Sequence, residues 1–296
     1  MGYFNNSTTW NESHDENINT FNDTDHNDFM FCTMNGCSSG KEAFVSYVIT
    51  WIIVCISLPL TLLAIYSLCF LVRKDHGAPV YIINLLISDL VQLLCMTSGV
   101  AYIGLLWVVD FIYYHGLFTS VGFMVCISLE RYLLIVWPLW YRFRRTIKTS
   151  VVVCVLVWIL PLVYFLTYIF DDQVKKYVAA IYILLPLPLF ILFLGGTLKA
   201  LSASISVSSD EKRRIVAVLV VLLLIYILLF LPTAIWFLAS KIIRVHFWIL
   251  SDILIQLSPL ADLILYIFMM KGATDKILAS LCCCRMQIQE STELTA

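Results

Sequence analysis

Acidic side chains inside long apolar stretches are the residues of this sequence best suited to chemistry. Asp89 and Asp262 each interrupt a run of hydrophobic residues, and a Glu130-Arg131 pair stands near the end of another run. A charge at the centre of a membrane costs roughly 2.5–3.5 kcal/mol or more, so such groups mark ion sites, proton sites or moving parts. Further polar side chains accompany them in the same runs: Asn84, Ser88, Ser120 and Ser258.

The composition indicates that lipid surrounds the elements that hold these groups. Hydrophobic residues make up 61% of the chain, charged residues make up 13%, and the mean hydropathy is +0.90. Soluble domains average about 45–50% apolar and about 25% charged residues, so a water-soluble fold could not bury this excess. The sequence therefore predicts an integral membrane protein.

Seven apolar windows are each long enough to cross a membrane as a helix. A crossing needs about 20 apolar residues, and short charged stretches separate most of the windows. The second and third windows are poorly separated, but the chain from Asp89 to Arg131 is too long for one crossing at about 1.5 Å per residue. We predict an all-α membrane protein, a seven-transmembrane helix bundle over residues 44–271, with spans near 45–72, 79–104, 106–137, 149–170, 177–203, 213–240 and 247–271.

The distribution of basic residues predicts the orientation of the bundle. With the N-terminus outside, thirteen Lys and Arg residues lie on the cytosolic side and five on the outer side. An excess of basic residues on the cytosolic side is the rule for membrane proteins. We therefore expect a multi-pass protein of the plasma membrane, with an extracellular N-terminus and a cytosolic C-terminus.

Residues 1–43 are predicted to form a disordered, glycosylated, extracellular tail. They are polar and acidic, and they lack the apolar core of a signal peptide. Cys32 and Cys37 lie on the oxidising side, where they could close a small disulfide loop. Sequons also occur by chance in Asn-rich stretches, so unmodified asparagines are the alternative to glycosylation. The sequons begin at Asn5, Asn6, Asn11 and Asn22.

Residues 272–285 are too short and too polar to span a membrane, and they are predicted to form an amphipathic helix on its inner surface. Cysteines beside such a helix are accessible to acylation, which favours palmitoylation, with reduced thiols as the alternative. Residues 286–296 are assigned to a cytosolic tail. The candidate palmitoylation sites are Cys282, Cys283 and Cys284.

Several short motifs stand in order along these spans: Asn84-Leu85-Leu86-Ile87-Ser88-Asp89, Glu130-Arg131-Tyr132, Trp158 with Pro161, Phe230-Leu231-Pro232 and Asp262-Leu263-Ile264-Leu265-Tyr266. Together they resemble the motifs of rhodopsin-like (class A) G-protein-coupled receptors. Each motif alone is weak, but the ordered set on seven spans is specific, and the resemblance covers about residues 44–285. It implies a receptor that relays an extracellular ligand to a heterotrimeric G protein.

Two subfamilies share further features with the sequence. Trp140-Tyr141-Arg142 and residues 150–154 resemble Mas-related receptors. Residues 186–189, the Gly195-Gly196 pair and the Asp at position 262 are closer to proton-sensing or lysolipid-like receptors. Both assignments stay open.

The resemblance implies a cation or proton site in the middle of the bundle. Asp89, Ser120, Ser258 and Asp262 would converge on one cavity, which corresponds to the sodium site of the family. Two carboxylates at short range repel each other, so they could bind a cation or share a proton. A sodium ion at Asp89 is the only bound cofactor that we expect.

The resemblance also implies which residues transmit the signal. Arg131 would pair with Glu130 at rest and turn toward the G protein when the sixth helix swings outward. Pro232 removes a backbone hydrogen bond and supplies a kink for that motion, with a static kink as the alternative. The residues expected to couple and activate are Glu130, Arg131, Tyr132, Phe230, Pro232 and Tyr266.

Departures from the family pattern make an atypical or signalling-silent receptor the alternative. Leu106 stands at the third-helix position of the family disulfide, and residues 170–176 of the facing loop hold no Cys. Lys212 stands where an acidic partner for Arg131 is sometimes found. Further departures are Thr61 for Asn in the first helix, Phe230 for Trp in the sixth, Leu263 for Pro in the seventh, and Leu194 or Gly196 for Tyr in the fifth.

The outer half of the bundle is aromatic with basic residues at its rim, which predicts a ligand pocket; an interfacial aromatic belt is the alternative. Tyr113 stands where an amine receptor carries Asp, so we do not expect amine binding, although Asp110 lies one turn outward. A lipid, an acidic metabolite or a short peptide fits better, and protons are a further candidate through His115 and His246. The candidate pocket residues are Tyr102, Asp110, Tyr113, Tyr114, Trp236 and Lys241.

Other classes of protein fit less well. A proton-coupled transporter could use Asp89 and Asp262, but the sequence shows no internal repeat. A membrane hydrolase would need a cluster of His and acidic ligands or a nucleophile with its base, and neither stands out. We therefore expect neither an enzyme nor a nucleic-acid-binding protein.

Overall fold

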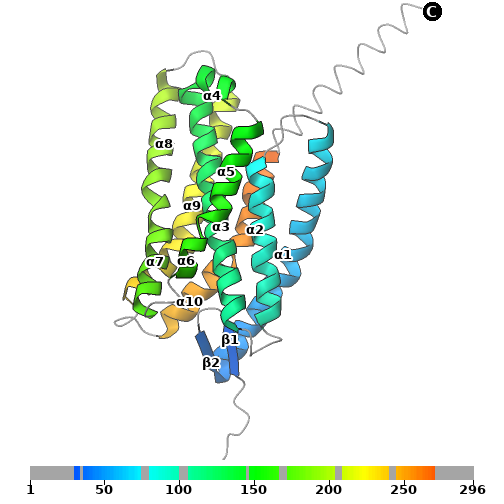
Figure 1. Ribbon diagram of the computed structural model, residues 1–296, viewed down its shortest axis with the longest axis vertical. Coiled ribbons are helices and arrows are strands. Elements are labelled where there is room, and N and C mark those ends of the chain that lie inside the picture. The colour runs from blue at the N-terminus through cyan, green and yellow to red at the C-terminus, as the bar shows by residue number, and fades with distance from the viewer. Residues whose placement is uncertain are drawn as a thin grey trace, which may run out of the picture.

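The computed structural model describes residues 30–33, 36–74, 80–99, 106–144, 147–166, 172–203, 209–239 and 245–270. In these residues, long helices lie side by side, with a small hairpin at one end of the bundle (Figure 1). The strands are β1 (Met30–Thr33) and β2 (Gly36–Ser39). The helices are α1 (Gly40–Lys74), α2 (Val80–Gly99), α3 (Leu106–Val136), α4 (Pro138–Arg144), α5 (Ile147–Ile159), α6 (Leu162–Leu166), α7 (Asp172–Leu184), α8 (Pro186–Ala203), α9 (Ser209–Ala239) and α10 (Val245–Gln256), followed by a helical segment at Ser258–Met270.

The described residues contain six segments that are long and apolar enough to span a membrane, and a bent pair of helices that forms a seventh. Two of the six consist of paired helices, because α5 and α6 form one span and α7 and α8 form another. The first pair is interrupted next to Pro161 and the second next to Pro186, since proline lacks the N–H that continues a helix. The predicted seven-span helical bundle is confirmed.

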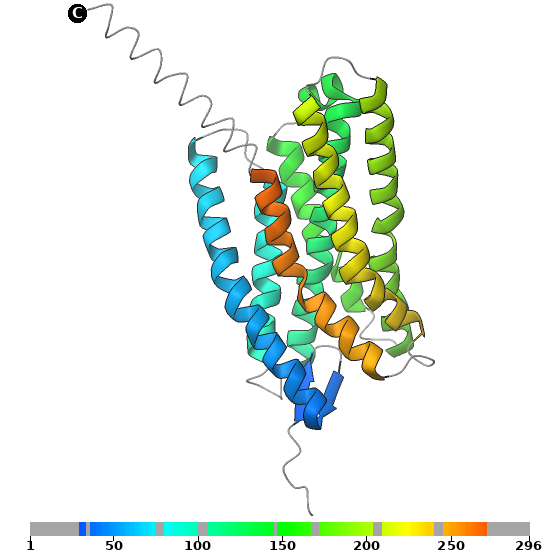
Figure 2. The same cartoon turned by 180° about the vertical axis from the view of Figure 1, so that it is seen from behind.

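The seventh span consists of α10 and Ser258–Met270, which meet at an angle of 40°. Pro259 explains the bend, because it cannot donate a hydrogen bond to the carbonyl of Ile255. Proline is well tolerated in the first turn of the following segment, where its N–H would have no helical partner. Figure 2 shows this span in orange between α1 and α9. The helix therefore bends although Leu263 replaces the proline expected later in the motif.

The prediction of a disordered tail over residues 1–43 is wrong for its last part. β1 and β2 pair as an antiparallel hairpin in which Cys32 lies opposite Cys37, and α1 already begins at Gly40. The sequence reading gave weight to polarity, but a short hairpin needs only paired backbone groups and a tight turn. The hairpin packs on α1 and α2. A disulfide between the two cysteines stays a prediction.

Helix α3 lies at the centre of the bundle and positions most of the polar residues discussed below. It packs against α2, α5, α8 and α9. A methyl group on Gly122 would lie 2.7 Å from Val157 Cγ1, so this glycine allows α3 and α5 to approach closely. On the outside of the bundle, large apolar side chains are exposed along α5, such as Val152 and Leu156, as expected of surfaces that contact lipid.

Candidate functional site

The four polar residues predicted to converge lie in one cluster in the middle of the bundle. Asp89, Ser120, Ser258 and Asp262 are all fully buried. The Ser120 hydroxyl donates to Asp262 Oδ2 at 3.1 Å. Helix α3 is therefore joined to the seventh span through this cluster.

Gln92 completes the cluster, and sequence reasoning missed it. Its amide nitrogen donates to Asp89 Oδ1 at 3.3 Å, and its Oε1 accepts a hydrogen bond from Ser258 at 3.3 Å. The signal was available, because Gln92 follows Asp89 by three positions and so shares its helix face. Its role is to orient the Asp89 carboxylate and to join it to Ser258.

The cluster holds more acceptors than donors. Asp89 Oδ2 and Asp262 Oδ1 are buried, and neither receives a hydrogen bond from the described residues. A buried carboxylate oxygen without a donor is costly unless it meets a proton or a cation. Carboxylate, hydroxyl and amide oxygens are the ligands that hard cations prefer, so these residues fit the expected sodium ion.

At the opposite end of α3 from the ion pair described below, the Glu130-Arg131-Tyr132 motif is fixed by neighbouring helices. Glu130 is buried, and its Oε1 accepts a hydrogen bond of 2.6 Å from the hydroxyl of Tyr141 on α4. Sequence reasoning used Tyr141 only as a mark of resemblance and missed this contact. The short helix α4 thus holds the acidic member of the motif.

Tyr132 occupies space that Gly196 leaves open on α8. Its ring lies 5.4 Å from the ring of Phe193, and a methyl group on Gly196 would lie only 2.5 Å from Tyr132 Cε2. Position 196 is one of the two where the family usually has a tyrosine. Here Tyr132 of α3 fills the space that a larger residue at position 196 of α8 would occupy. The loss of the family's tyrosine on α8 is therefore compensated by a close contact between α3 and α8.

Two basic side chains connect the start of α9 to its neighbours. Lys212 Nζ donates to the carbonyl oxygen of Leu201 on α8 at 3.3 Å, and Arg214 Nη2 donates to the carbonyl oxygen of Met269 in the seventh span at 2.5 Å. Both acceptors lie in the last turn of their helices, where carbonyls lack helical partners and the helix dipole favours cations. The contacts therefore hold this end of α9 against both neighbours.

The other residues expected to drive activation are packed inside the bundle. Phe230 is fully buried and stacks on Tyr226 at 5.0 Å, and Pro232 lies inside α9. The hydroxyl of Tyr226 in turn donates to the carbonyl of Ile183 on α7. Tyr266 shares a hydrogen bond of 2.7 Å with Ser67 of α1. Their roles in activation stay predictions.

An ion pair joins α3 to α7 at the end of the bundle where the hairpin lies. Lys175 Nζ lies 2.9 Å from Asp110 Oδ2, and both side chains are partly exposed, to 25% and 12% respectively. Sequence reasoning placed Asp110 in a pocket and Lys175 at its rim without pairing them. Because Leu106 stands where the family disulfide would begin, this ion pair connects the two elements that the disulfide would join.

Tyr113 and Tyr114 are buried next to this ion pair, and Asp252 of α10 lies within electrostatic reach of both hydroxyls. Asp252 is a buried acidic residue that sequence reasoning missed, although its place in an apolar run was a clear signal. It accepts a hydrogen bond of 2.7 Å from Gln256, which itself accepts one from Thr50 of α1 at 2.7 Å. The predicted pocket region thus contains a second acidic group.

Several other predicted residues can be located. Trp236 is half-buried on α9. His115 is half-buried in α3, where a ring nitrogen lies 3.0 Å from the carbonyl oxygen of Trp158 and the two rings stack. The remaining predicted sites lie outside the described residues: Tyr102, Lys241, Asn5, Asn6, Asn11, Asn22, Cys282, Cys283, Cys284 and the segment 272–285.

Comparison with known proteins supports the receptor reading. Residues 63–179 match the family model described as the 7 transmembrane receptor (rhodopsin family). Proteinase-activated receptor 1 of Xenopus laevis is 24% identical over 78% of this chain, and the match spans 64% of its own length. Mas-related G-protein coupled receptor member X2 of Macaca mulatta is 28% identical over 80% of this chain and 81% of its own. G-protein coupled receptor 68 of Mus musculus is 25% identical over 83% of this chain and 78% of its own.

These matches agree with the fold and with the position of the motifs. The family model begins in α1 and ends in α7, so it includes the acidic residue of α2 and the whole of α3. The relatives extend the similarity beyond that range, and they include a Mas-related receptor, from one of the two subfamilies whose features the sequence shares. We conclude that this multi-pass membrane protein is similar to the rhodopsin-like family of G-protein-coupled receptors, over residues 63–179 by the family model and over about four fifths of the chain by its relatives.

Proposed function

We propose that the protein relays an extracellular ligand to heterotrimeric G proteins in the plasma membrane, through an outward motion of the sixth span, α9. In this proposal the N-terminus lies outside the cell and the C-terminus inside, which the excess of basic residues on one side of the spans supports. The end of α9 that begins at Ser209 then faces the cytosol.

The observation that carries the proposal is the way in which this inner end of α9 is held. Lys212 and Arg214 bind backbone carbonyls on two different neighbours, and such contacts can be exchanged for others without unfolding a helix. Pro232 lies further along α9 and interrupts its backbone hydrogen bonds, so the inner part can pivot there. Arg131 lies on the adjacent helix, where the outward motion of α9 would open a surface for the G protein.

The decisive experiment is a G-protein activation assay in cells that express one Gα class at a time. We expect the intact chain to activate at least one class and Arg131→Ala to activate none. Lys148→Ala serves as control, because Lys148 is exposed at the start of α5 and is not part of the motif. Equal signals from the intact chain and the Arg131 variant, or silence of the intact chain in every class, would exclude this function in favour of a silent receptor.

We further propose that the Asp89–Asp262 cluster binds a sodium ion or shares a proton, and that this occupancy sets the balance between resting and active states. The orphaned carboxylate oxygens support the assignment. The ligand itself is proposed to be a lipid, an acidic metabolite, a short peptide or protons. Signalling that rises as the external pH falls from about 8 to about 6 would favour protons, and a flat response would remove them.

A further inference from the structure

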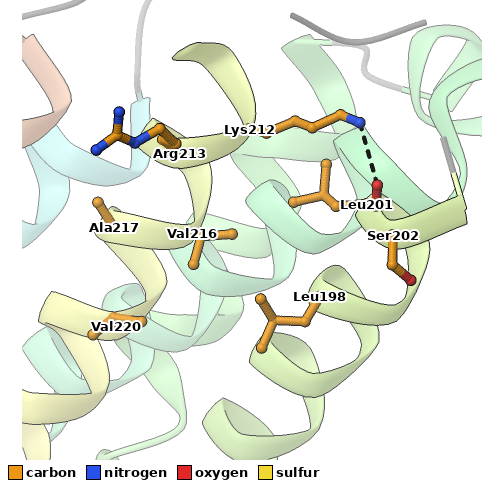
Figure 3. A pocket seen from close by; sticks show the side chains of 8 residues that line it. All are labelled: Leu198, Leu201, Ser202, Lys212, Arg213, Val216, Ala217 and Val220. Carbon is orange, nitrogen blue, oxygen red and sulfur yellow. Dashed lines mark hydrogen bonds between the residues drawn. The ribbon is translucent and has the colours of Figure 1, made fainter. Parts of the chain in front are cut away.

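A cavity of about 540 Å³ opens between the inner ends of α8 and α9 (Figure 3). Its floor is apolar and comes from both helices. This volume is in the range of sites that bind small organic ligands, roughly 300–1,000 Å³. The floor residues that matter here are Leu198 and Leu201 on α8 and Val216, Ala217 and Val220 on α9.

Basic residues lie at one end of this cavity. Lys212 reaches across to α8, where its Nζ contacts the Leu201 carbonyl, and Arg213 is the next residue on the first turns of α9 (Figure 3). The Arg213 side chain is exposed, and it has no hydrogen bond or ion pair with any described residue. An exposed guanidinium on a long, flexible stem can turn toward an anion at the mouth of the cavity.

The cavity lies where two apolar spans end. One span ends at Ser202 and the next begins at Lys212, so the basic residues stand at the ends of the spans, and Leu198, Ala217 and Val220 lie further along them toward the apolar interior. An amphiphile with a negatively charged headgroup fits this arrangement, because its apolar tail can contact the floor and its headgroup can contact the basic residues. With the orientation of the proposed function, on which this step rests, the leaflet concerned is the cytosolic one, whose lipids are rich in negative charge.

We propose that this cavity binds an anionic phospholipid of the cytosolic leaflet. The phosphate lies against Lys212 and Arg213, and one acyl chain follows the floor along Leu198, Ala217 and Val220. The lipid thus contacts the helix that moves in signalling and the helix that stays beside it. Its occupancy is therefore a means by which membrane composition acts on the spacing of α8 and α9.

The test measures lipid retention by the purified full-length chain, without ligand or G protein. The protein is reconstituted with equal amounts of phosphatidylglycerol and phosphatidylcholine and stripped with mild detergent, and the lipids that remain are counted by native mass spectrometry. We expect phosphatidylglycerol to be retained preferentially by the intact chain. Lys212→Gln with Arg213→Gln should lower that preference about tenfold or more, since each basic residue near an anionic surface contributes substantially to binding.

A charge-matched control separates this site from general attraction to the surface. Lys148→Gln with Lys199→Gln removes two exposed basic residues that do not line the cavity and should leave the preference unchanged. Arg213→Gln alone keeps the Lys212 contact to α8 and should give an intermediate loss. Ala217→Phe fills the floor without changing charge, and it should reduce retention of both lipids at this site.

Two results would overturn the assignment: an unchanged preference in the Lys212 and Arg213 variant, or an equal loss in the control pair. If the preference is unchanged and a separate binding assay shows that the same variant has lost G-protein binding, the cavity is assigned to a protein partner instead. Because retention needs no signalling, a receptor that activates no G protein would contradict the proposed function and leave this inference standing.

Discussion

The middle of the bundle and its inner end satisfy their polar groups in opposite ways. In the middle, two carboxyl groups share few donors, and one oxygen of each receives none from the described residues. At the inner end, Lys212 and Arg214 supply donors to carbonyls that end two helices. On our proposal, the two carboxyl groups in the middle take up a proton or a cation from outside the chain. At the inner end, the chain itself supplies the donors to the carbonyls of Leu201 and Met269, and a motion of α9 would have to break these contacts.

The largest effect should come from filling the space at Gly196. Gly196→Val places methyl groups against the ring of Tyr132, so one of the two helices must shift, and overpacking of this kind typically costs about 1–3 kcal/mol. Gly195→Val is the matched control, because nothing lies within 4 Å of its added Cβ. Thermal unfolding in detergent should separate the two variants. Equal melting temperatures of the two variants would mean that α3 and α8 accommodate the added side chain without loss of stability.

The next effect concerns the middle of the bundle. If Asp89 and Asp262 bind sodium, the free energy of unfolding of the intact chain should rise by about 1.4 kcal/mol for each tenfold increase in sodium above the dissociation constant. Choline at the same ionic strength should have no such effect. Asp89→Asn should abolish the sodium dependence, while Asp252→Asn, at another buried carboxylate outside the cluster, should retain it. A sodium effect that survives in Asp89→Asn would place the ion elsewhere.

A smaller effect is expected from releasing the inner end of α9. Lys212→Gln with Arg214→Gln removes the cationic donors to Leu201 and Met269, and each contact contributes about 0.5 kcal/mol, the lower end of the range for hydrogen bonds, because both side chains are half-buried. Basal G-protein activation should rise several-fold, because the active position of α9 no longer competes with these contacts. Lys199→Gln, an exposed basic residue on α8, should leave basal activity unchanged. Basal activity that stays flat in the double variant would show that other contacts hold α9.

The smallest effect on stability is expected at the third region, the end of the bundle that carries the Asp110–Lys175 ion pair. The Asp110–Lys175 pair matches its charges internally but is partly exposed, so Lys175→Gln should cost about 0.2–1 kcal/mol of stability. The exchange Asp110→Lys with Lys175→Asp should recover part of that loss. High salt should weaken the contribution of the pair in the intact chain. If the exchange variant is no more stable than Lys175→Gln, the pair does not act as a link between α3 and α7.

The sequence allowed the number of spans and the residues of the central cluster to be predicted, because both depend on local features. Apolar length identifies a span, and motifs in fixed order place Asp89 and Asp262 at matching depths. The partners of Gln92 and Asp252 could not be predicted in this way. Both residues are polar positions inside apolar runs, but whether a polar side chain faces a partner depends on the rotation of its helix about the helix axis. The sequence of that helix determines this rotation only weakly.

Contacts between elements could not be predicted for the same reason. The Tyr141–Glu130 bond depends on a short helix that turns back toward α3, and the Arg214–Met269 bond depends on where two helices end. The bend at Pro259 was predictable from its chemistry, but attention to the altered Leu263 position obscured it. The hairpin was missed because its strands are short and lie within a polar stretch.

The hairpin has a mechanical consequence that follows from its junction with α1. β2 ends at Ser39 and α1 starts at the next residue, so no slack chain separates them. A molecule that binds and displaces the hairpin would therefore displace or rotate α1 as well. Further along, α1 contacts the seventh span through Thr50 and Ser67, so a displacement of α1 at the hairpin would act on the helix that carries Tyr266.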